Sequence, residues 1–112
     1  MSQLTTHILD TSIGKPAQGV SIVLKQYQNS EWKVLGEGKT NSDGRLPDLL
    51  NADVKLQTGV YHLVFDTASY FKLQGTKAFY PEVTIAFEVT DASHYHVPLL
   101  LNPYGYSTYR GS

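Results

Sequence analysis

The sequence predicts an all-β fold: a two-sheet antiparallel sandwich of seven to eight strands with one short helix. Short runs rich in valine, isoleucine, tyrosine, phenylalanine and threonine recur along the 112 residues. Glycine, proline, asparagine and aspartate separate these runs, which is the rhythm of antiparallel sandwiches and barrels. In Val83–Val89, apolar side chains occupy every second position, as in a strand with one buried face. A chain of this length forms one core, so we expect a single domain over residues 1–112.

The first half of the chain contains three expected strands. Leu4–Asp10 is the first, and the turn-like stretch Ile13–Pro16 closes it. Val20–Tyr27 follows, with alternate apolar side chains on one face. The dipeptide Asn29–Ser30 then turns the chain into Trp32–Leu35, which completes a hairpin.

Beyond this hairpin the polar loop Thr40–Gly44 delivers Arg45. The aspartate and glycine that end the loop form a turn in which the glycine can take a positive φ. The next strand, Val60–Phe65, is apolar at both alternating sets of positions, so we expect it to be covered on both sides.

The second half contains the one expected helix and the last strands. Thr67–Leu73 lacks strand alternation, and either its first residue or Asp66 could cap a short helix. After Val83–Val89, the final strands are His96–Leu101 and Tyr104–Arg110. Between them, Asn102-Pro103 reads as a tight turn.

Composition excludes several classes of function. Lys and Arg total 9 against 10 Asp and Glu, with no cluster of either sign, which argues against nucleic-acid or anionic-membrane partners. Without cysteine, the chain has no disulfide, thiolate zinc site or catalytic thiol. The sequence MSQLTTHILD lacks the features of a secretory signal, and no apolar run approaches the ~20 residues of a membrane span. We expect a soluble, cytoplasmic protein.

The strand His96–Leu101 has an unusual second face. One face is apolar and predicted to be core, formed by Val97, Leu99 and Leu101. Side chains alternate along a strand, so His96, Pro98 and Leu100 point the other way. A face of this composition is not an ordinary solvated surface, so we expect it to line a pocket or to be covered by another subunit.

Taken one at a time, the candidate residues also have structural interpretations. A lone histidine such as His96 or His7 is most often a surface residue, and Arg45 a solvated loop cation. His62 fits a hydrogen-bonded structural histidine. His94 and His96 have the spacing of a zinc pair, but no third ligand is evident, so no metal is expected. Tyrosines of the last strand ordinarily pack on a sheet face, as Tyr104, Tyr106 and Tyr109 would.

The last nineteen residues favour a functional interpretation of these candidate residues over the structural one. HYHVPLLLNPYGYSTYRGS, from His94 to Ser112, closely resembles the C-terminal signature of the 5-hydroxyisourate hydrolases, and the ending Tyr109–Ser112 is its most specific part. LTTHILD around His7, the SDGR loop with Arg45, KPAQGV and FYPEVTIAFEV extend the resemblance over essentially the whole chain. The family usually has serine at the position of Asn102 and varies at the position of Gly105; neither position is a catalytic candidate.

The resemblance implies a transthyretin-like sandwich assembled as a homotetramer, a dimer of dimers with active sites in the channel between dimers. It implies hydrolysis of the lactam ring of 5-hydroxyisourate, in urate degradation to allantoin, to 2-oxo-4-hydroxy-4-carboxy-5-ureidoimidazoline, without cofactor or metal. The implied catalytic residues are His7, Arg45, His96 and Ser112. Those implied to bind substrate are His7, Arg45, Tyr109 and Arg110.

These residue types suit the reaction. An imidazole titrates near neutral pH, so His96 or His7 can take a proton from water, and which of them is the base stays open. Arg45 offers a permanently charged fork of donors to a planar ring and to a developing oxyanion. Tyr109 could contact the ring, and Ser112 could contribute its hydroxyl or a terminal carboxylate.

Two other classes share the fold. A transthyretin-like carrier of a small aromatic ligand would use the same channel, but such a channel should be mainly apolar and neutral. An adhesion-type sandwich explains the strand alternation and leaves the C-terminal signature unexplained.

Overall fold

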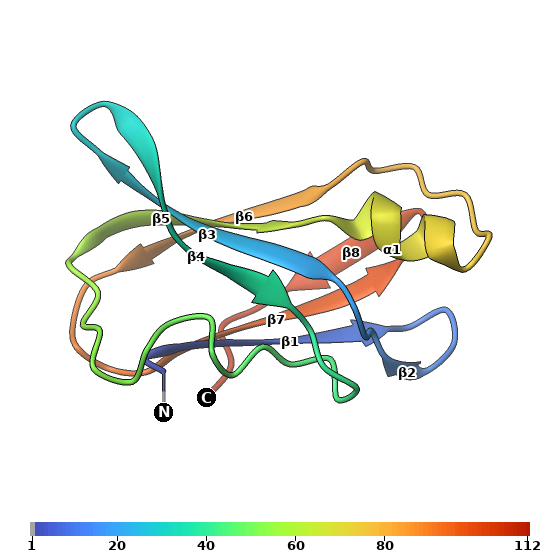
Figure 1. The fold of residues 1–112 in the computed structure, drawn as a ribbon, viewed down its shortest axis with the longest axis horizontal. Helices are drawn as coiled ribbons and strands as arrows, with labels where there is room; N and C mark the ends of the chain where they lie inside the picture. Colours follow the sequence, from blue (N-terminus) through green and yellow to red (C-terminus); the bar gives the residue numbers. More distant parts are fainter. Residues whose placement is uncertain (1) are drawn as a thin grey trace.

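The computed structural model describes residues 2–112; Met1, which the expected domain of residues 1–112 includes, lies outside them. Eight strands and one helix are found in the described part (Figure 1). Their bounds are β1 Leu4–Asp10, β2 Lys15–Pro16, β3 Ser21–Gln28, β4 Glu31–Lys39, β5 Gly59–Phe65, α1 Thr67–Leu73, β6 Val83–Val89, β7 Tyr95–Asn102 and β8 Gly105–Thr108. The all-β class with one short helix is confirmed, and the single-domain assignment stays a prediction.

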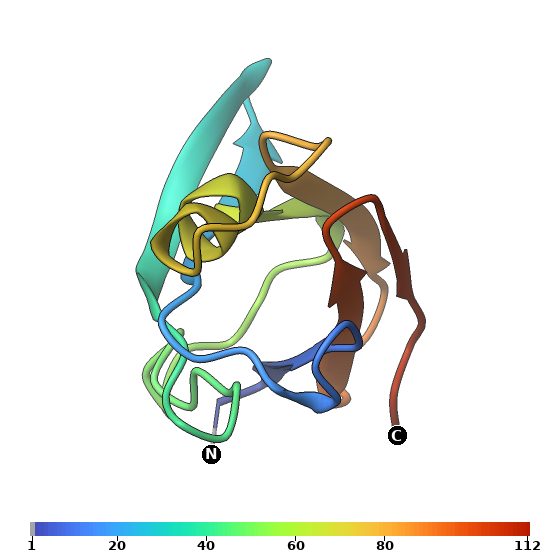
Figure 2. The same cartoon turned by 90° about the vertical axis from the view of Figure 1, so that its right-hand side faces the viewer.

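The strands form two four-stranded sheets, in the orders β2-β1-β7-β8 and β4-β3-β5-β6. The sheets lie face to face with α1 near one end (Figure 2). Every pairing is antiparallel except that of β1 with β7, which is parallel and runs from Leu4 opposite Tyr95 to Asp10 opposite Leu101. The expected two-sheet antiparallel sandwich is therefore confirmed, with this one parallel pair in it. The whole second sheet separates β1 from β7 along the chain, so no hairpin turn sets their relative direction.

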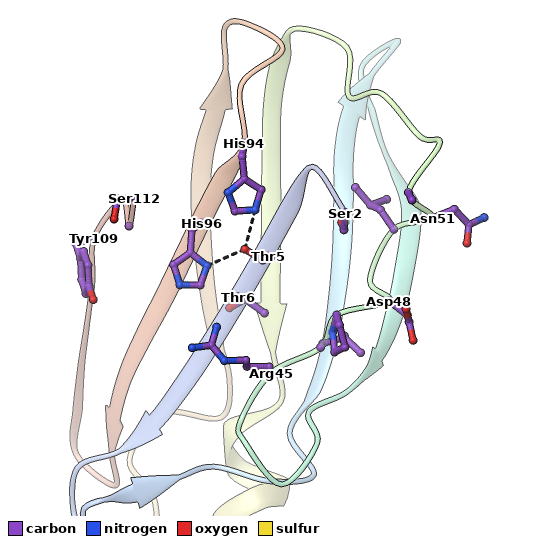
Figure 3. Close-up of a pocket in the computed structure, with 15 residues that line it drawn as sticks. Ser2, Thr5, Thr6, Arg45, Asp48, Asn51, His94, His96, Tyr109 and Ser112 are labelled. Carbon is purple, nitrogen blue, oxygen red and sulfur yellow. Dashed lines mark hydrogen bonds between the residues drawn. The ribbon is translucent and has the colours of Figure 1, made fainter.

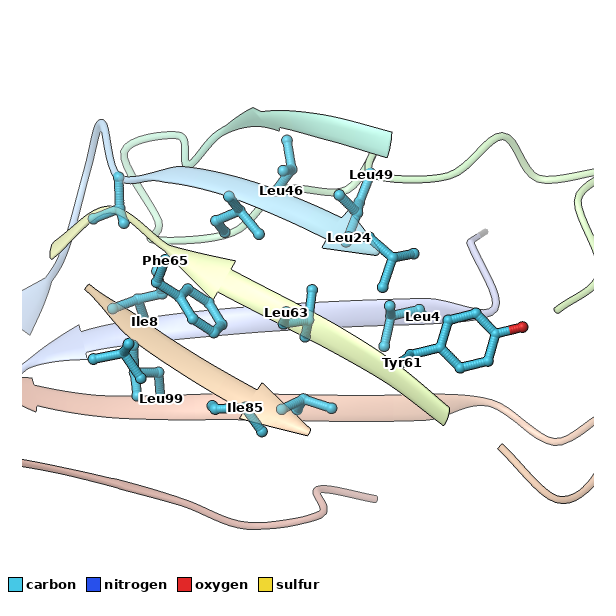
Figure 4. Close-up of a cluster of buried hydrophobic side chains, with 14 of the residues drawn as sticks. Leu4, Ile8, Leu24, Leu46, Leu49, Tyr61, Leu63, Phe65, Ile85 and Leu99 are labelled. Atoms are coloured by element: carbon cyan, nitrogen blue, oxygen red, sulfur yellow. The ribbon is translucent and has the colours of Figure 1, made fainter. Parts of the chain in front are cut away.

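The core fills the space between the sheets and follows the period-two pattern of the sequence. In β1 and β5 alternate side chains are buried, and the largest include Ile8, Tyr61 and Phe65 (Figure 4). In β7 the inward side chains are those expected: Val97, Leu99 and Leu101. The opposite face of β7 therefore belongs to the outside of the sandwich, as the alternation predicts.

Several element bounds agree with the sequence expectation. Leu4–Asp10, Thr67–Leu73 and Val83–Val89 coincide with β1, α1 and β6. The cap of α1 is Asp66, whose carboxylate accepts a hydrogen bond from the amide of Ser69 at 3.2 Å. Buried aromatic residues of α1 hold the helix against the sandwich end.

Three other expectations needed correction. The strand expected over Trp32–Leu35 continues to Lys39, because it stays paired with β3 along its full length. The last strand ends at Thr108, short of Arg110. A turn was expected over Ile13–Pro16, but its last two residues form the short strand β2, which pairs with β1.

The expectation that Val60–Phe65 is covered on both sides was also wrong. Only its inward side chains are buried, and Val60 on the outer face is 43% exposed. Among residues 2–112 no second layer covers this outer face, so apolar residues at both sets of positions did not mark a fully enclosed strand. Among residues 2–112, no helix has the length and apolar character needed to cross a membrane.

Candidate active site

The outer face of the sheet β2-β1-β7-β8 carries the side chains that the sequence singled out. The parallel register sets Thr5 beside His96 and His7 beside Pro98. Paired residues in a sheet point to the same side, so both histidines face outward. Two isolated bridges extend these rows, one joining His7 to Arg45 and the other His96 to Gly111.

Arg45 reaches this face through a tightly hydrogen-bonded loop. The Asn41 side chain accepts hydrogen bonds from the amides of Asp43 and Arg45, at 2.9 and 3.1 Å. The carbonyl of Gly44 accepts a bond from the amide of Ile8 at 2.8 Å, which ties the loop to the edge of β1. Gly44 has φ +72°, and a side chain there would overlap the Ile8 carbonyl oxygen, so the expected glycine turn is confirmed.

The C-terminal segment returns along β7 and covers part of the face. The Gly111 amide donates to the His96 carbonyl at 2.8 Å. A Cβ at Gly111 would overlap Cδ2 of His96, so only glycine lets the backbone pass this close to the imidazole. Arg110 turns away and donates to Ser93 Oγ at 3.2 Å, and its guanidinium carbon lies 4.3 Å from the centre of the Tyr95 ring.

A cavity of about 980 Å³ opens between the C-terminal segment and the loop that follows Arg45. Its lining includes residues from β1, from the segment 45–52, from the start of β7 and from the tail. In Figure 3 the rings of His94 and His96 lie side by side, and the guanidinium of Arg45 lies next to His96. Tyr109 and Ser112 flank the histidines on one side. The site therefore combines imidazoles, a guanidinium and hydroxyl groups in one hollow.

His96 is held in a defined position and electrostatic setting. Its Nδ1 lies 2.8 Å from the hydroxyl oxygen of Thr5. Partial burial lowers the pKa of His96 below the ordinary histidine value, and the positive charge of Arg45 lowers it further. His96 is consequently neutral at neutral pH and has a ring nitrogen available to accept a proton.

The structure brings most of the expected site residues together. Arg45, His96, Tyr109 and Ser112 line the cavity. His7 is not among the lining residues, although it is close enough to contribute to the lowered pKa of His96. Arg110 also lies outside the lining, where its contacts are with the segment that precedes β7.

Sequence reasoning missed Thr5, which contacts both cavity histidines. Its only signal was that it shares a strand face with His7. That signal gains meaning only when the β1–β7 pairing sets Thr5 opposite His96. Within residues 2–112, no group of three or more metal-ligating His, Cys, Asp or Glu side chains is present.

Comparisons with known proteins point to one family. A family model described as "Transthyretin: HIUase/Transthyretin family" matches residues 4–111. The 5-hydroxyisourate hydrolase of Mesorhizobium japonicum is 50% identical over 114 residues, covering 98% of this chain and 92% of that protein. The 5-hydroxyisourate hydrolase of Mus musculus is 46% identical over 114 residues, covering 99% of this chain and 96% of that protein.

Solved structures of both an enzyme and a carrier resemble the fold. Sea bream transthyretin in complex with thyroxine matches with a TM-score of 0.92 and 29% identity, covering 98% of this chain and 95% of that one. Klebsiella pneumoniae 5-hydroxyisourate hydrolase matches with a TM-score of 0.85 and 37% identity, covering 97% of this chain and 92% of that one. The backbone alone does not distinguish an enzyme from a carrier. The side chains that line the cavity have to distinguish them.

Proposed function

Because the chain belongs to the HIUase/Transthyretin family, we propose that its outer-face cavity is the active site of a 5-hydroxyisourate hydrolase. The observation that carries the proposal is that His96, Arg45 and Ser112 line one cavity. Each comes from a different part of the chain, and together they supply a base, a fixed positive charge and a hydroxyl. The reaction opens the lactam ring of 5-hydroxyisourate to give 2-oxo-4-hydroxy-4-carboxy-5-ureidoimidazoline.

In this proposal His96 is the general base. Its lowered pKa keeps the ring neutral at neutral pH, and Nδ1 is occupied by Thr5, so Nε2 is left for a water molecule in the cavity. His96 takes a proton from this water as the oxygen attacks the lactam carbonyl. The C–N bond of the lactam then breaks, and the departing ring nitrogen receives a proton. His7, beside Arg45 in the sheet, is the candidate for orienting the water or donating that proton.

Arg45 stabilises the negative charge that develops on the carbonyl oxygen. Its guanidinium is positively charged and presents N–H donors in a fixed plane. A preorganised donor of this kind contributes about 10²–10³ to the rate of acyl transfer. Tyr109 would contact the ring of the substrate, and Ser112 would add a hydroxyl. Arg110 was expected to bind substrate; its contacts outside the cavity support an indirect part, in which it holds the tail in place.

A carrier function has less support from the same site. The backbone resembles transthyretin with thyroxine closely, so a small aromatic ligand would fit the architecture. However, two histidines and an arginine border this cavity, and burying an apolar ligand against them would desolvate a fixed charge. The residues that line the cavity therefore favour catalysis over the transport of a ligand.

We also propose that the active protein is a homotetramer, a dimer of dimers, with this face lining the channel between dimers. His96 and Leu100 remain partly exposed on an outer face that also carries Leu9. Covering such a face removes apolar surface from water, which stabilises an assembly. Sedimentation should give a particle four times the 12.5 kDa mass of the chain, and a monomer at working concentrations would contradict the proposal. The cytoplasmic location stays a prediction.

The direct test is the ultraviolet absorbance of freshly prepared 5-hydroxyisourate with and without the purified protein. An enzyme accelerates its decay in proportion to protein concentration and turns over a large excess of substrate. A carrier would leave the decay unchanged or slow it through binding. The variant His96→Ala should retain the fold and lose at least about two decades of turnover, in line with a lost general base.

A further inference from the structure

The Thr5 hydroxyl lies between two imidazoles at the edge of the cavity. Its oxygen is 2.8 Å from Nδ1 of His96 and 3.0 Å from Nε2 of His94, and both contacts are drawn in Figure 3. The two rings are 6.4 Å apart and nearly parallel, at 16°. His96 is half-buried, whereas His94 is exposed to solvent. The three groups therefore form a line from the cavity to its rim.

Counting protons limits this line to two arrangements when both histidines are neutral. A hydroxyl has one hydrogen, so Thr5 donates to one ring nitrogen and accepts from the other. In the first arrangement, Nδ1–H of His96 donates to Thr5, and Thr5 donates to Nε2 of His94. In the second, Nε2–H of His94 donates to Thr5, and Thr5 donates to Nδ1 of His96. Only the first leaves Nε2 of His96 free to act as a base.

We propose that Thr5 and His94 form a proton relay that carries to solvent the proton His96 takes from water. This proposal rests on the assignment of His96 as the base in the proposed function. The net reaction needs such a path, because hydrolysis of a lactam to a carboxylate and a neutral ureido nitrogen releases one proton. That proton must leave a site that already contains the positive charge of Arg45.

The transfer balances without any further reactant. Attack breaks an O–H bond of water, and its proton binds Nε2 of His96. The Nδ1 proton of the resulting imidazolium moves to the oxygen of Thr5 while the hydroxyl proton of Thr5 moves to Nε2 of His94. His94 then releases its own Nδ1 proton to solvent. His96 ends neutral with its proton on Nε2. The first arrangement returns after product release, when each imidazole loses its Nε2 proton to water and takes up a proton from water on Nδ1.

The charges around the relay favour this direction. Burial is the largest cause that lowers the pKa of His96, the positive charge of Arg45 lowers it further, and His94 and His7 contribute less. His94 contacts Arg110 only through its backbone carbonyl, at 3.4 Å, and its exposed ring is solvated. These effects disfavour a proton on His96, and Thr5 and His94 act as positioning and transfer groups behind the catalytic histidine.

The test compares Thr5→Val, which keeps the shape and removes the hydroxyl, with Thr5→Ser, which keeps the hydroxyl. Thr5→Val should lower kcat at least about 10-fold with little change in KM, whereas Thr5→Ser should stay within about threefold of wild type. In Thr5→Val and in His94→Gln, kcat should rise with the concentration of added imidazole buffer, because a small base then removes the proton. Wild type should show no such dependence.

A matched control is Thr84→Val on the outer face of the other sheet. The Thr84 hydroxyl donates a hydrogen bond to the carboxylate of Glu82. It should leave kcat within about twofold, and unfolding curves should confirm that all variants fold. The relay is wrong if Thr5→Val keeps the wild-type kcat, if Thr5→Ser is as impaired as Thr5→Val, or if buffer has no effect on either impaired variant. Full activity of His96→Ala would instead remove the base itself, which distinguishes a failed site assignment from a failed relay.

Discussion

Each of the two sheets carries a partly exposed histidine on its outer face, and the surroundings of the two histidines differ. His96 on β7 lies beside the Thr5 hydroxyl, within the field of Arg45 and under the C-terminal segment. His62 on β5 stacks on Trp32 at 3.8 Å between ring centres and has Lys25 as its neighbour across the sheet. Both residues are histidines on the outer face of an inner strand, so the reactive character of His96 must come from what surrounds it.

The difference arises from the segments that flank the strands of each sheet. The segment 45–52 and the tail flank β1 and β7 of the sheet β2-β1-β7-β8, and with residues of both strands they line a cavity. On the outer face of the other sheet, aromatic side chains, including Tyr27 and Trp32, are exposed. A histidine in a half-enclosed hollow loses hydration and gains directed neighbours, both of which change its protonation.

The largest expected difference between the two faces is the loss of activity when the cationic side chain on each is removed. Arg45 pairs in the sheet with His7, and Lys25 pairs with His62. Arg45→Ala should lower kcat/KM by at least about two decades, because the developing oxyanion loses its fixed donor. Lys25→Ala should change it by less than about twofold. Steady-state assays of both variants check this, and near-normal hydrolysis by Arg45→Ala would remove that residue from the mechanism.

A smaller effect should follow from a single methyl group on the tail. Gly111→Ala introduces a Cβ that overlaps the His96 ring, so the imidazole or the tail must shift. Misplacing a catalytic group by about 1 Å costs up to about 10²-fold, so we expect a loss in kcat of about 10- to 100-fold. At Gly105, a Cβ would meet only Asn102 at 3.7 Å, an ordinary contact, so Gly105→Ala serves as the control. Equal activity of the two variants would contradict the tight packing of the tail on His96.

The protonation of His96 should itself depend on Arg45. Burial lowers its pKa first and Arg45 second, so Arg45→Gln should raise the pKa toward the ordinary histidine value of about 6.5. Titration of the imidazole signals by NMR measures this without any need for activity. Since the pKa is lower in the folded state, the unfolded state binds the proton first as pH falls. The stability contributed by neutral His96 should therefore be present above about pH 6.5 and be lost as pH falls from there through the folded pKa.

The smallest effect on catalysis should come from the aromatic cluster of the second face. Trp32→Ala removes the stacking on His62 and the contact with Tyr27, whose ring centre is 5.1 Å away. An aromatic pair of this kind contributes about 1 kcal/mol beyond its buried area, so urea denaturation should detect a modest loss of stability. The value of kcat/KM should stay within about twofold. A large loss of activity would mean that the two faces are coupled.

The sequence predicted those features of the two faces that depend only on the alternation of apolar and polar residues along a strand. Period-two patterning gave the bounds of β1 and β6 and the outward direction of His96. It failed for the outer face of Val60–Phe65, because valine suits an exposed strand face as well as a covered one. It also could not identify Thr5, since only the parallel pairing of β1 with β7 brings that hydroxyl to the histidines. No short turn joins these two strands, so the local sequence pattern could not predict that they pair.

The measurement that tests the account most directly is the rate of 5-hydroxyisourate decay with the two variants His96→Asn and His62→Asn. Each removes one outer-face imidazole, and neither side chain is fully buried. The account predicts a loss of at least about 100-fold for His96→Asn and a change of less than about twofold for His62→Asn. Comparable activities in the two variants, whether both high or both low, would contradict the assignment of the chemistry to the β2-β1-β7-β8 face.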